Sequence, residues 1–324
     1  MWRRRRCCAV GWTARGWRAR DARATRPSRS ISILTVSCER MMREAEQEQR
    51  QPDVSVIIAA FQARDFIDTA LASVLAQQHQ DFEIVVAPDE PDDYQSLAQR
   101  DPRIRVLAPV AVPTGPAKAR NRATAAARGR FIAVLDADDC WSPNYLSRLL
   151  PLAERHGTAY GRTAISDWQG RELRSIPARD HQATIGFHEF AAAYGSLHGV
   201  TRLDPGRQWQ DLLAEDVLYD LESLALAGGA APYASDAVYT LRIRPQSLSH
   251  SDHFIQRIDA GYEQLIGLIR GGATAIAKPH FEPAAAVFHS WQQMNAKFAA
   301  AWQADRSIEF HAFVAGSAGA PAVE

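Results

Sequence analysis

From Pro52 onward, short apolar runs rich in Val and Ile alternate with segments whose apolar positions recur at helical spacing. The apolar runs predict four strands, at Val54–Ala60, Glu83–Ala87, Ile104–Ala108 and Phe131–Asp136. Between them the spacing predicts three helices, at about Asp65–Gln77, Asp92–Arg100 and Pro116–Arg128. This alternation is typical of an α/β chain with a mostly parallel sheet flanked by helices, in which ligands bind at the carboxyl ends of the strands.

The pattern after Pro143 is less regular. A helix begins at this proline, a segment without a clear period follows, and a helix and a strand are predicted near Ala214–Ala227 and Ala237–Ile243. Two long helical patterns, His253–Ile269 and Pro283–Trp302, then precede a tail of small residues at 315–324. We therefore expect the α/β domain to end near residue 250 and a helical extension to cover 251–314.

The first part of the chain differs in texture, because it shows neither a strand period nor a helix period and is crowded with arginine. Residues 1–50 contain 13 Arg and 5 acidic residues. We interpret residues 1–51 as a disordered, Arg-rich extension. A transit peptide has this kind of composition. A start codon assigned too early would also explain it, since Met41 and Met42 stand shortly before the first predicted strand.

Charge and cysteine content exclude several classes of protein. The whole chain has 37 basic and 37 acidic residues, so the part after residue 50 has 24 basic and 32 acidic ones. An acidic body without a basic stripe argues against a nucleic-acid partner. No apolar run approaches the roughly 20 residues of a membrane-spanning helix. The four cysteines lack C-x-x-C spacing, which argues against a disulfide scaffold or a structural zinc site.

The sharpest chemical feature is the acidic sequence Asp136-Ala-Asp138-Asp139 at the end of the fourth predicted strand. Side chains alternate along a strand, so Asp136 and Asp138 project to the same side. Two such carboxylates repel each other unless a cation shares them, and a divalent ion that also binds water and phosphate oxygens suits this arrangement. The alternative is an acidic loop that caps the next helix, with Ser142 and Pro143 as N-cap and first-turn residues. Both can hold together.

Other interpretations of these aspartates fit less well. A calcium loop would need an oxygen ligand and a glycine where Cys140 and Trp141 stand. A phosphatase of the haloacid dehalogenase type normally opens its domain with such a strand, whereas three predicted strands come first here. The chain contains neither G-x-x-x-x-G-K-[ST] nor G-x-G-x-x-G, so neither a P-loop nor a dinucleotide-binding turn is predicted.

Several motifs, taken in order, resemble the family 2 inverting glycosyltransferases. They are Ser55–Gln62, Ser73–Gln77, Asp81–Val86, Lys118–Asn121, Ala127–Ile132, Leu135–Asp139, the pair Glu215-Asp216 at the start of a helix, Gly228, and Arg242–Ser249. The resemblance covers about residues 54–250. It implies the GT-A fold, a Rossmann-like sheet whose donor half is 52–142 and whose acceptor half is 143–250.

The resemblance implies transfer of one sugar, with inversion, from a nucleoside diphosphate donor to an acceptor hydroxyl, and a UDP-sugar is favoured. It assigns contacts with the nucleotide sugar to Ala59, Ala60, Asp89, Lys118, Arg120, Asp136 and Ala137. Asp89 would accept the N3 hydrogen of a uracil-like base, although the Asp-Asp-Gly-Ser usual in the family is Pro88–Pro91 here. Asp138, together with Asp136, would hold a divalent metal, Mn²⁺ or Mg²⁺, that stabilises the departing diphosphate.

The resemblance also assigns the catalytic residues to the acid pair Glu215 and Asp216, with Asp216 as the general base. The charge of Glu215 raises the pKa of such an acid and the helix N-terminus lowers it, and the sequence leaves open which effect dominates. Arg244 stands where the family often has His. The Gln-x-x-Arg-Trp element of processive synthases is missing after Asp216, so we expect single-sugar transfer rather than polymerisation.

The expected acceptor is a glycan or a lipid-linked sugar, in polysaccharide, cell-envelope or glycoconjugate synthesis. We expect a cytoplasmic enzyme, with peripheral contact at the inner face of the membrane left open. Two alternatives are a glycosyltransferase-like binding protein that has lost catalysis and a nucleotidyltransferase, although the latter lacks a phosphate loop at Ala59–Gln62. His198, Trp209 and His250 lie near these segments in the sequence, and packed or solvated positions are equally open for them.

Overall fold

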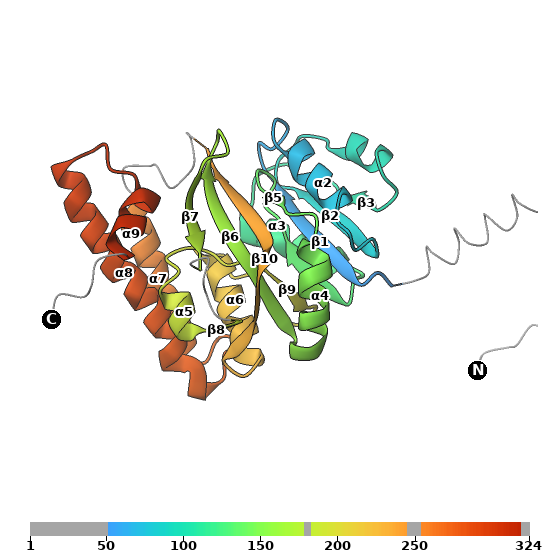
Figure 1. Cartoon of the computed structure of the whole chain (residues 1–324). Coiled ribbons are helices and arrows are strands. Elements are labelled where there is room, and N and C mark those ends of the chain that lie inside the picture. Colours follow the sequence, from blue (N-terminus) through green and yellow to red (C-terminus); the bar gives the residue numbers. More distant parts are fainter. Residues whose placement is uncertain (1–50, 178–182, 245–253, 319–324) are drawn as a thin grey trace, which may run out of the picture. The chain divides into compact units, whose positions relative to one another are not determined.

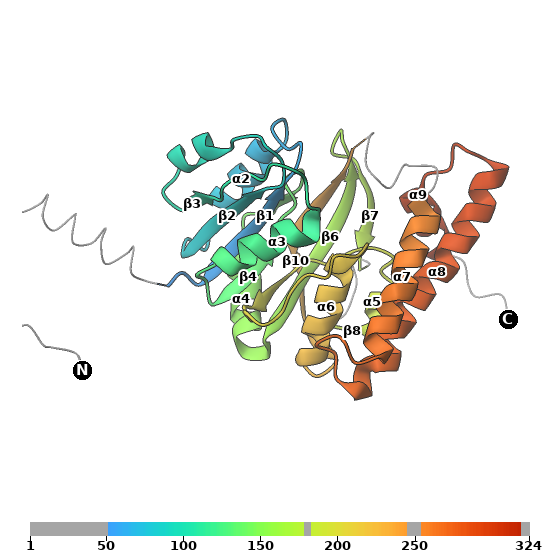
Figure 2. The ribbon, with the colours of Figure 1, turned by 180° about the vertical axis from the view of Figure 1, so that it is seen from behind.

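A ten-stranded sheet runs through the described part of the chain, which is residues 51–177, 183–244 and 254–318 of this computed structural model. Eight strands lie side by side in the order β3-β2-β1-β4-β9-β6-β10-β5, while β7 pairs with β6 and β8 with β10. Helices cover both faces of this sheet (Figures 1 and 2). Because β1, β2, β3, β4, β6 and β10 all run in one direction, the predicted mostly parallel α/β sheet is confirmed.

The first half of the sheet follows the prediction closely. Its parallel strands are β1 (Val54–Ala60), β2 (Phe82–Pro88), β3 (Ile104–Val106) and β4 (Phe131–Val134), and its helices are α2 (Ile67–Leu75) and α3 (Pro116–Ala126). The helix predicted at Asp92–Arg100 is instead a short 3₁₀ helix, η1 (Gln95–Gln99). Asp93 Oδ1 accepts a hydrogen bond from Gln95 N at 2.8 Å, a local bond that competes with a longer helix.

The second half of the sheet is less visible in the sequence. Its long strands β6 (Thr158–Asp167) and β10 (Ala230–Ile243) pair in parallel, and β9 (Gly199–Arg202) lies antiparallel between β4 and β6. Short strands β5 (Cys140–Trp141), β7 (Glu172–Ile176) and β8 (Thr184–Gly186) complete it. The sequence predicts only the last part of β10, because Pro232 and the small residues around it obscure the strand pattern.

Two helices flank this second half at the predicted places, α4 (Tyr145–His156) and α6 (Glu215–Leu226). The predicted Ser142 cap of α4 is wrong, since Asn144 occupies the N-cap position. Ser142 Oγ instead accepts a hydrogen bond from Val238 N of β10 at 2.9 Å and donates one to Asn144 Oδ1 at 2.7 Å. The Ser142 hydroxyl therefore binds the neighbouring strand β10 and does not cap the helix.

The two helices predicted after residue 250 are present as α7 (Phe254–Arg270) and α8 (Phe281–Ala304), which pack against each other and are joined by a turn containing the 3₁₀ helix η3 (Lys278–His280). Helix α5 (Phe187–Ala191) packs on α8 (Figure 2). A last helix, α9 (Phe310–Ala318), enters the region that we expected to be a tail. Within 51–177, 183–244 and 254–318, no helix combines the length and the apolar character needed to cross a bilayer.

The core explains why β1 reads as an unbroken apolar run. Val56 and Ile58 point into a cluster shared with α2, whereas Ile57 points into a cluster on the opposite face, shared with α3. Both faces of the strand are therefore buried, as expected for a central parallel strand. The sheet-facing side of α3 is built of alanines, Ala119 and Ala123 among them, which lets this helix lie close to the strand ends that carry the polar residues.

Gly161 lies where β6 approaches β10 most closely, and it generates a stability prediction. A Cβ at this position would lie 2.6 Å from Ala237 O and 2.8 Å from Tyr145 Cε2. Gly161→Ala should therefore lower the free energy of unfolding by about 1–3 kcal/mol, as expected for overpacking. The control is Gly267→Ala in the exposed face of α7, where a Cβ meets nothing within 4 Å and stability should rise by about 0.5–1 kcal/mol. Urea unfolding measures both, and equal effects of the two substitutions would contradict this account.

Candidate active site

The acidic turn after β4 is held in place by β10. Tyr239 Oη donates to Asp139 Oδ2 at 2.7 Å and accepts from Asp136 N at 3.1 Å. Arg242 N donates to Asp139 Oδ1 at 2.8 Å. Asp139 is buried and serves as the anchor of the turn, which leaves Asp136 and Asp138 as the two carboxylates available for ligands.

Each of these two carboxylates lies against a guanidinium. Arg120 Nη2 is 2.7 Å from Asp136 Oδ1, and Arg244 Nε is 2.7 Å from Asp138 Oδ2. Burial acts to raise the pKa of Asp136, but the charge and hydrogen bond of Arg120, together with the charges of His198 and Arg244, outweigh it and hold the pKa below its usual range. Burial and the neighbouring charge of Asp136 raise the pKa of Asp138, against the opposing effect of Arg244.

Arg120 connects this turn to the acid pair at the start of α6. It is only 6% exposed, and its Nη1 lies 2.5 Å from Glu215 Oε1. Burial raises the pKa of the Glu215 carboxyl to about 7, although the Arg120 guanidinium acts to lower it. Asp136 and Glu215, which are far apart in the sequence, are therefore joined through one buried cation.

Asp216 lies next to Glu215 but has a different partner. Ser196 Oγ donates to Asp216 Oδ2 at 2.5 Å, which leaves the other carboxylate oxygen free of this bond. The residue before the pair, Ala214, has a left-handed backbone with φ of 62°, a conformation that non-glycine residues adopt at a cost. The sequence reasoning missed Ser196, because no spacing or motif relates a serine in an irregular segment to the helix 20 residues later.

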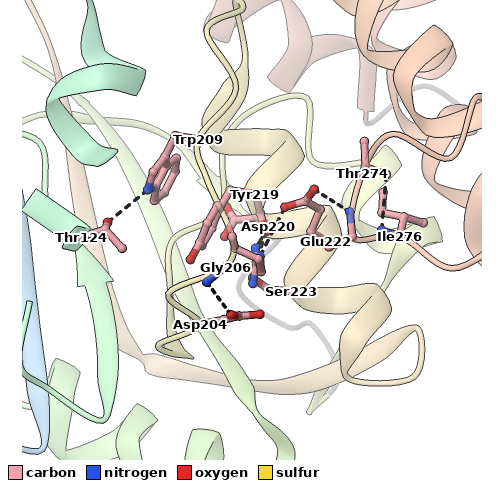
Figure 3. Close-up of polar contacts among 12 residues, drawn as sticks. Thr124, Asp204, Gly206, Trp209, Tyr219, Asp220, Glu222, Ser223, Thr274 and Ile276 are labelled. Carbon is pink, nitrogen blue, oxygen red and sulfur yellow. Dashed lines mark hydrogen bonds and ion pairs between the residues drawn. The ribbon is translucent and has the colours of Figure 1, made fainter. Parts of the chain in front are cut away.

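The segment that leads into α6 is fastened at several points. Asn121 of α3 and the main chain of Trp209 exchange two hydrogen bonds, at 2.8 and 2.9 Å. The indole of Trp209 stacks on Tyr219, with ring centroids 3.9 Å apart. Its Nε1 donates to Thr124 Oγ1 at 3.4 Å (Figure 3). Trp209 is thus a packed residue, one of the two options that the sequence leaves open.

A buried ion pair fixes the same segment from the other side. Arg207 Nε lies 3.3 Å from Glu222 Oε2, and Arg207 Nη2 donates to the main-chain oxygen of Tyr219 at 2.6 Å. Glu222 Oε1 also accepts a hydrogen bond at 3.0 Å from Ala275 N, in the turn after α7 (Figure 3). The start of α6 is therefore held by α3 and by the segment before it, and its middle by the helical extension.

The predicted base-binding residue, Asp89, lies at the end of β2 and is buried. Its N donates to Ala60 O at 2.7 Å, and its carboxylate accepts hydrogen bonds from Thr114 N, Thr114 Oγ1 and Gly115 N at 2.6–3.0 Å. Asp89 thus holds the turn that precedes α3, whatever else it binds. Ala59 and Ala60 pair with Ala87 and Pro88 of β2, so they lie at the same edge of the sheet.

The remaining predicted residues lie in different surroundings. Lys118 Nζ pairs with Asp211 Oδ2 at 2.6 Å on the surface, so of the two predicted cations of α3 it is Arg120 that reaches the acidic turn. Ala137 is buried within that turn. His198 is packed, with its ring 3.6 Å from that of Tyr239, and His250 is outside the described residues.

The donor set of the acidic turn fits a hard divalent cation. Burial and the charges of Asp136 and Asp138 raise the pKa of Asp139 well above its usual range, but Tyr239 and Arg242 already bind its carboxylate, so Asp136 and Asp138 are the two acids left for a cation. No group of three or more His, Cys, Asp or Glu among residues 51–177, 183–244 and 254–318 forms a metal cluster. Mg²⁺ at nucleotide sites binds one or two carboxylates and takes its other ligands from water and phosphate.

The chain is similar in sequence to known proteins. Residues 55–200 match the family model of glycosyl transferase family 2. The chain is 33% identical over 219 residues to the succinoglycan biosynthesis protein ExoO of Rhizobium meliloti. The aligned region covers 61% of this chain and 63% of ExoO. It is 34% identical over 110 residues to the Escherichia coli UDP-Glc:alpha-D-GlcNAc-diphosphoundecaprenol beta-1,3-glucosyltransferase WfgD. That aligned region covers 33% of this chain and 43% of WfgD. The chain thus spans less than two thirds of the length of either relative.

The fold has counterparts among solved structures. The mannosyltransferase PcManGT from Pyrobaculum calidifontis, in complex with GDP-Man and Mn²⁺, superposes with a TM-score of 0.51 at 16% identity, and the alignment covers 89% of each chain. Identity at this level relates the two folds alone. With the family match over residues 55–200 and the order of the strands, it shows that the described residues have the GT-A fold and that this stretch of the chain resembles glycosyltransferase family 2.

Proposed function

We propose that this chain is an inverting glycosyltransferase that moves one sugar from a nucleoside diphosphate donor to an acceptor hydroxyl in polysaccharide or cell-envelope synthesis. Asp216 is the general base that takes the proton of the acceptor hydroxyl as its oxygen attacks the anomeric carbon. The bond from that carbon to the diphosphate breaks in the same step, and the diphosphate leaves with the bonding electrons. Inversion follows from attack on the face opposite the leaving group.

The observation that carries this proposal is the bridge that Arg120 makes between Asp136 and Glu215. It fastens the end of β4, where the donor diphosphate is expected, to the start of α6, where the base is expected. A single guanidinium thereby fixes the separation between the expected site of the leaving diphosphate and the base that takes the proton of the attacking hydroxyl. Positioning of this kind is a large part of what an enzyme contributes to a displacement between two bound substrates.

The proposed donor is a UDP-sugar, and the proposed acceptor is a glycan or a lipid-linked sugar. The name of WfgD specifies a UDP-glucose donor and a diphosphoundecaprenol-linked acceptor, and the name of ExoO specifies succinoglycan synthesis. An enzyme with a lipid-linked acceptor would meet it at the inner face of the membrane from the cytoplasm. A single sugar would be added in each reaction.

The proposal includes a divalent metal, Mn²⁺ or Mg²⁺, held by Asp138 with Asp136. When bound, it would neutralise the charge that develops on the departing diphosphate. The Mn²⁺ in the PcManGT complex supports this choice. Arg120 and Arg244, which already lie against these carboxylates, provide further positive charge for the same phosphates.

The assignment of Asp216 as base predicts the outcome of two amide substitutions. The test is release of nucleoside diphosphate from UDP-, GDP- and dTDP-sugars with Mn²⁺ or Mg²⁺, with and without glycan acceptors. Asp216→Asn should lower kcat by about 10²- to 10⁴-fold, the usual contribution of a general base, with little change in donor affinity. Glu215→Gln should cost less, because Glu215 faces Arg120 rather than the acceptor. A folded Asp216→Asn protein with the parent rate would refute the assignment, and release from no donor would favour a binding protein.

The metal assignment predicts how nucleotide binding responds to metal removal. Calorimetry with UDP should show tight binding with Mn²⁺ and a loss of at least tenfold in affinity with EDTA or in Asp138→Ala. Asp167→Ala, at an exposed ion pair with Arg171, is the control and should bind UDP like the parent. Binding that is equal in EDTA, in Asp138→Ala and in the parent would rule out a metal at this turn.

The Arg120 bridge predicts a strong energetic coupling. Arg120→Met leaves the buried Glu215 carboxylate without its cation, so it should lower the free energy of unfolding by about 3–5 kcal/mol. Adding Glu215→Gln should recover part of this loss, because the amide is neutral. A double-mutant cycle by urea unfolding measures the coupling. Additive effects of the two substitutions would mean that the bridge contributes nothing to stability.

A further inference from the structure

A small pocket lies beneath the acid pair, between α3, β4, β9 and α6, and the function proposed above uses only Arg120 and Asp216 of its lining. Its volume is about 30 Å³. Its polar lining comes from Arg120, His198, Thr201, Trp209, Asp216, Tyr219 and Asp220, and apolar residues of β4 close the other side. A cavity of this size has room for about two water molecules, provided that polar partners are present.

Three polar atoms of the pocket's lining residues have no hydrogen-bond partner in the protein: Arg120 Nε, His198 Nδ1 and Tyr219 Oη. Their side chains are buried, since Arg120 is 6%, His198 8% and Tyr219 3% exposed. Buried polar atoms are rarely left without a partner, because the loss of hydration costs free energy. The shared pocket is therefore the place where these atoms would find water.

Two carboxylates of α6 also reach this pocket. Asp216 and Asp220 are one turn apart, so they lie on the same face of the helix. The nearby cations are already committed, because Arg120 binds Asp136 and Glu215, and Arg207 binds Glu222. Two carboxylates that share one small pocket, with no cation of their own, cannot both be ionised at low cost.

The surroundings of Asp220 determine which of the two is neutral. The titratable and charged groups that act on it or face it are Asp216 and Tyr219 of α6, Arg120 of α3, Arg207 before α6, His198 just before β9, Tyr145 of α4, and Tyr160 of β6. Burial, followed by the charge of Asp216, raises the pKa of Asp220 well above its usual range, and burial lowers the pKa of His198 to about 4. Asp220 is therefore the protonated acid of the pocket, and His198 is neutral.

We propose that water in this pocket links Asp216 to Asp220, and that Asp220 is a positioning residue that donates its proton, through this water, in a hydrogen bond to the Asp216 carboxylate. The inference rests on the proposed function, in which Asp216 is the base. Ser196 holds one side of that carboxylate and the water holds another. Two hydrogen bonds thereby hold the base in place.

Two substitutions of Asp220 separate this function from that of an ionised acid. Asp220→Asn keeps a neutral donor, so kcat should stay within about threefold of the parent. Asp220→Leu removes the donor, so kcat should fall about tenfold, equivalent to 1.4 kcal/mol, and the acid limb of the kcat profile should move to higher pH, because the carboxylate of Asp216 loses a hydrogen bond. Asp236→Asn, at an exposed ion pair with Arg148, is the control and should match the parent.

The outcomes that overturn the proposal are distinct. A loss in Asp220→Asn as large as that in Asp216→Asn would show that Asp220 works ionised. Parental kinetics in Asp220→Leu would show that the pocket does not act on the base. A crystal structure of the full chain at a resolution that shows water must contain water within hydrogen-bond distance of Asp220 and of at least one of the three unpartnered atoms, and a dry pocket would refute the link.

A further measurement does not depend on activity and is independent of whether Asp220→Leu folds. An aspartate held neutral in the native state has a folded pKa above the unfolded value of about 3.9, so its stabilising effect is present below that pH and is lost as the pH rises through the folded pKa. The Tm of Asp220→Asn minus that of the parent should therefore increase as the pH is raised from about 4 to 8. A constant difference would refute the neutral acid. If the parent transfers no sugar, the proposed function fails, but the Tm and water measurements still test the pocket.

Discussion

The structure depends on one guanidinium being buried between two carboxylates that belong to different parts of the fold. Arg120 is on α3, Asp136 follows β4 and Glu215 begins α6. Removing these charges from water is costly, and only close pairing offsets that cost. The three elements therefore cannot shift independently, and the distance between the acidic turn and the acid pair is set by the reach of a single side chain.

The alanine-rich face of α3 is what allows this pairing. Small side chains at Ala119 and Ala123 let the helix lie near the sheet, so that Arg120 is buried at the ends of the strands. Asp216, the second acid of the pair, is supported by bonds from the helical extension and from β7. Trp291 Nε1 of α8 donates to Ala191 O at 3.1 Å, and Arg174 of β7 donates to Ala193 O and Tyr194 O at 2.8 Å. These bonds hold the segment whose Ser196 contacts Asp216.

The sequence predicts the first half of the fold well, and the reason is physical. β1, β2 and β4 are buried on both faces and most of their residues are apolar, so hydrophobicity alone marks them. β6 contains polar residues that pair with β7 and β10, so its own sequence lacks the apolar run that would predict a buried strand. The acidic residues Asp136, Asp138, Glu215 and Asp216 could be chosen from motifs. Ser196, Tyr239 and Arg207 could not, because their importance lies in contacts between segments far apart in the chain.

Three of the four acids of α6 each face a different partner: Glu215 faces Arg120, Asp216 faces Ser196, and Glu222 faces Arg207. Successive residues of an α-helix are rotated by about 100°. A residue inserted or deleted between Asp216 and Glu222 would turn one end of the helix relative to the other by that angle, and the two ends could no longer meet their partners together. The number of residues between Asp216 and Glu222 is therefore fixed by the rotation of the helix, more than by the distance that it spans. Insertions that the protein tolerates must lie outside this segment.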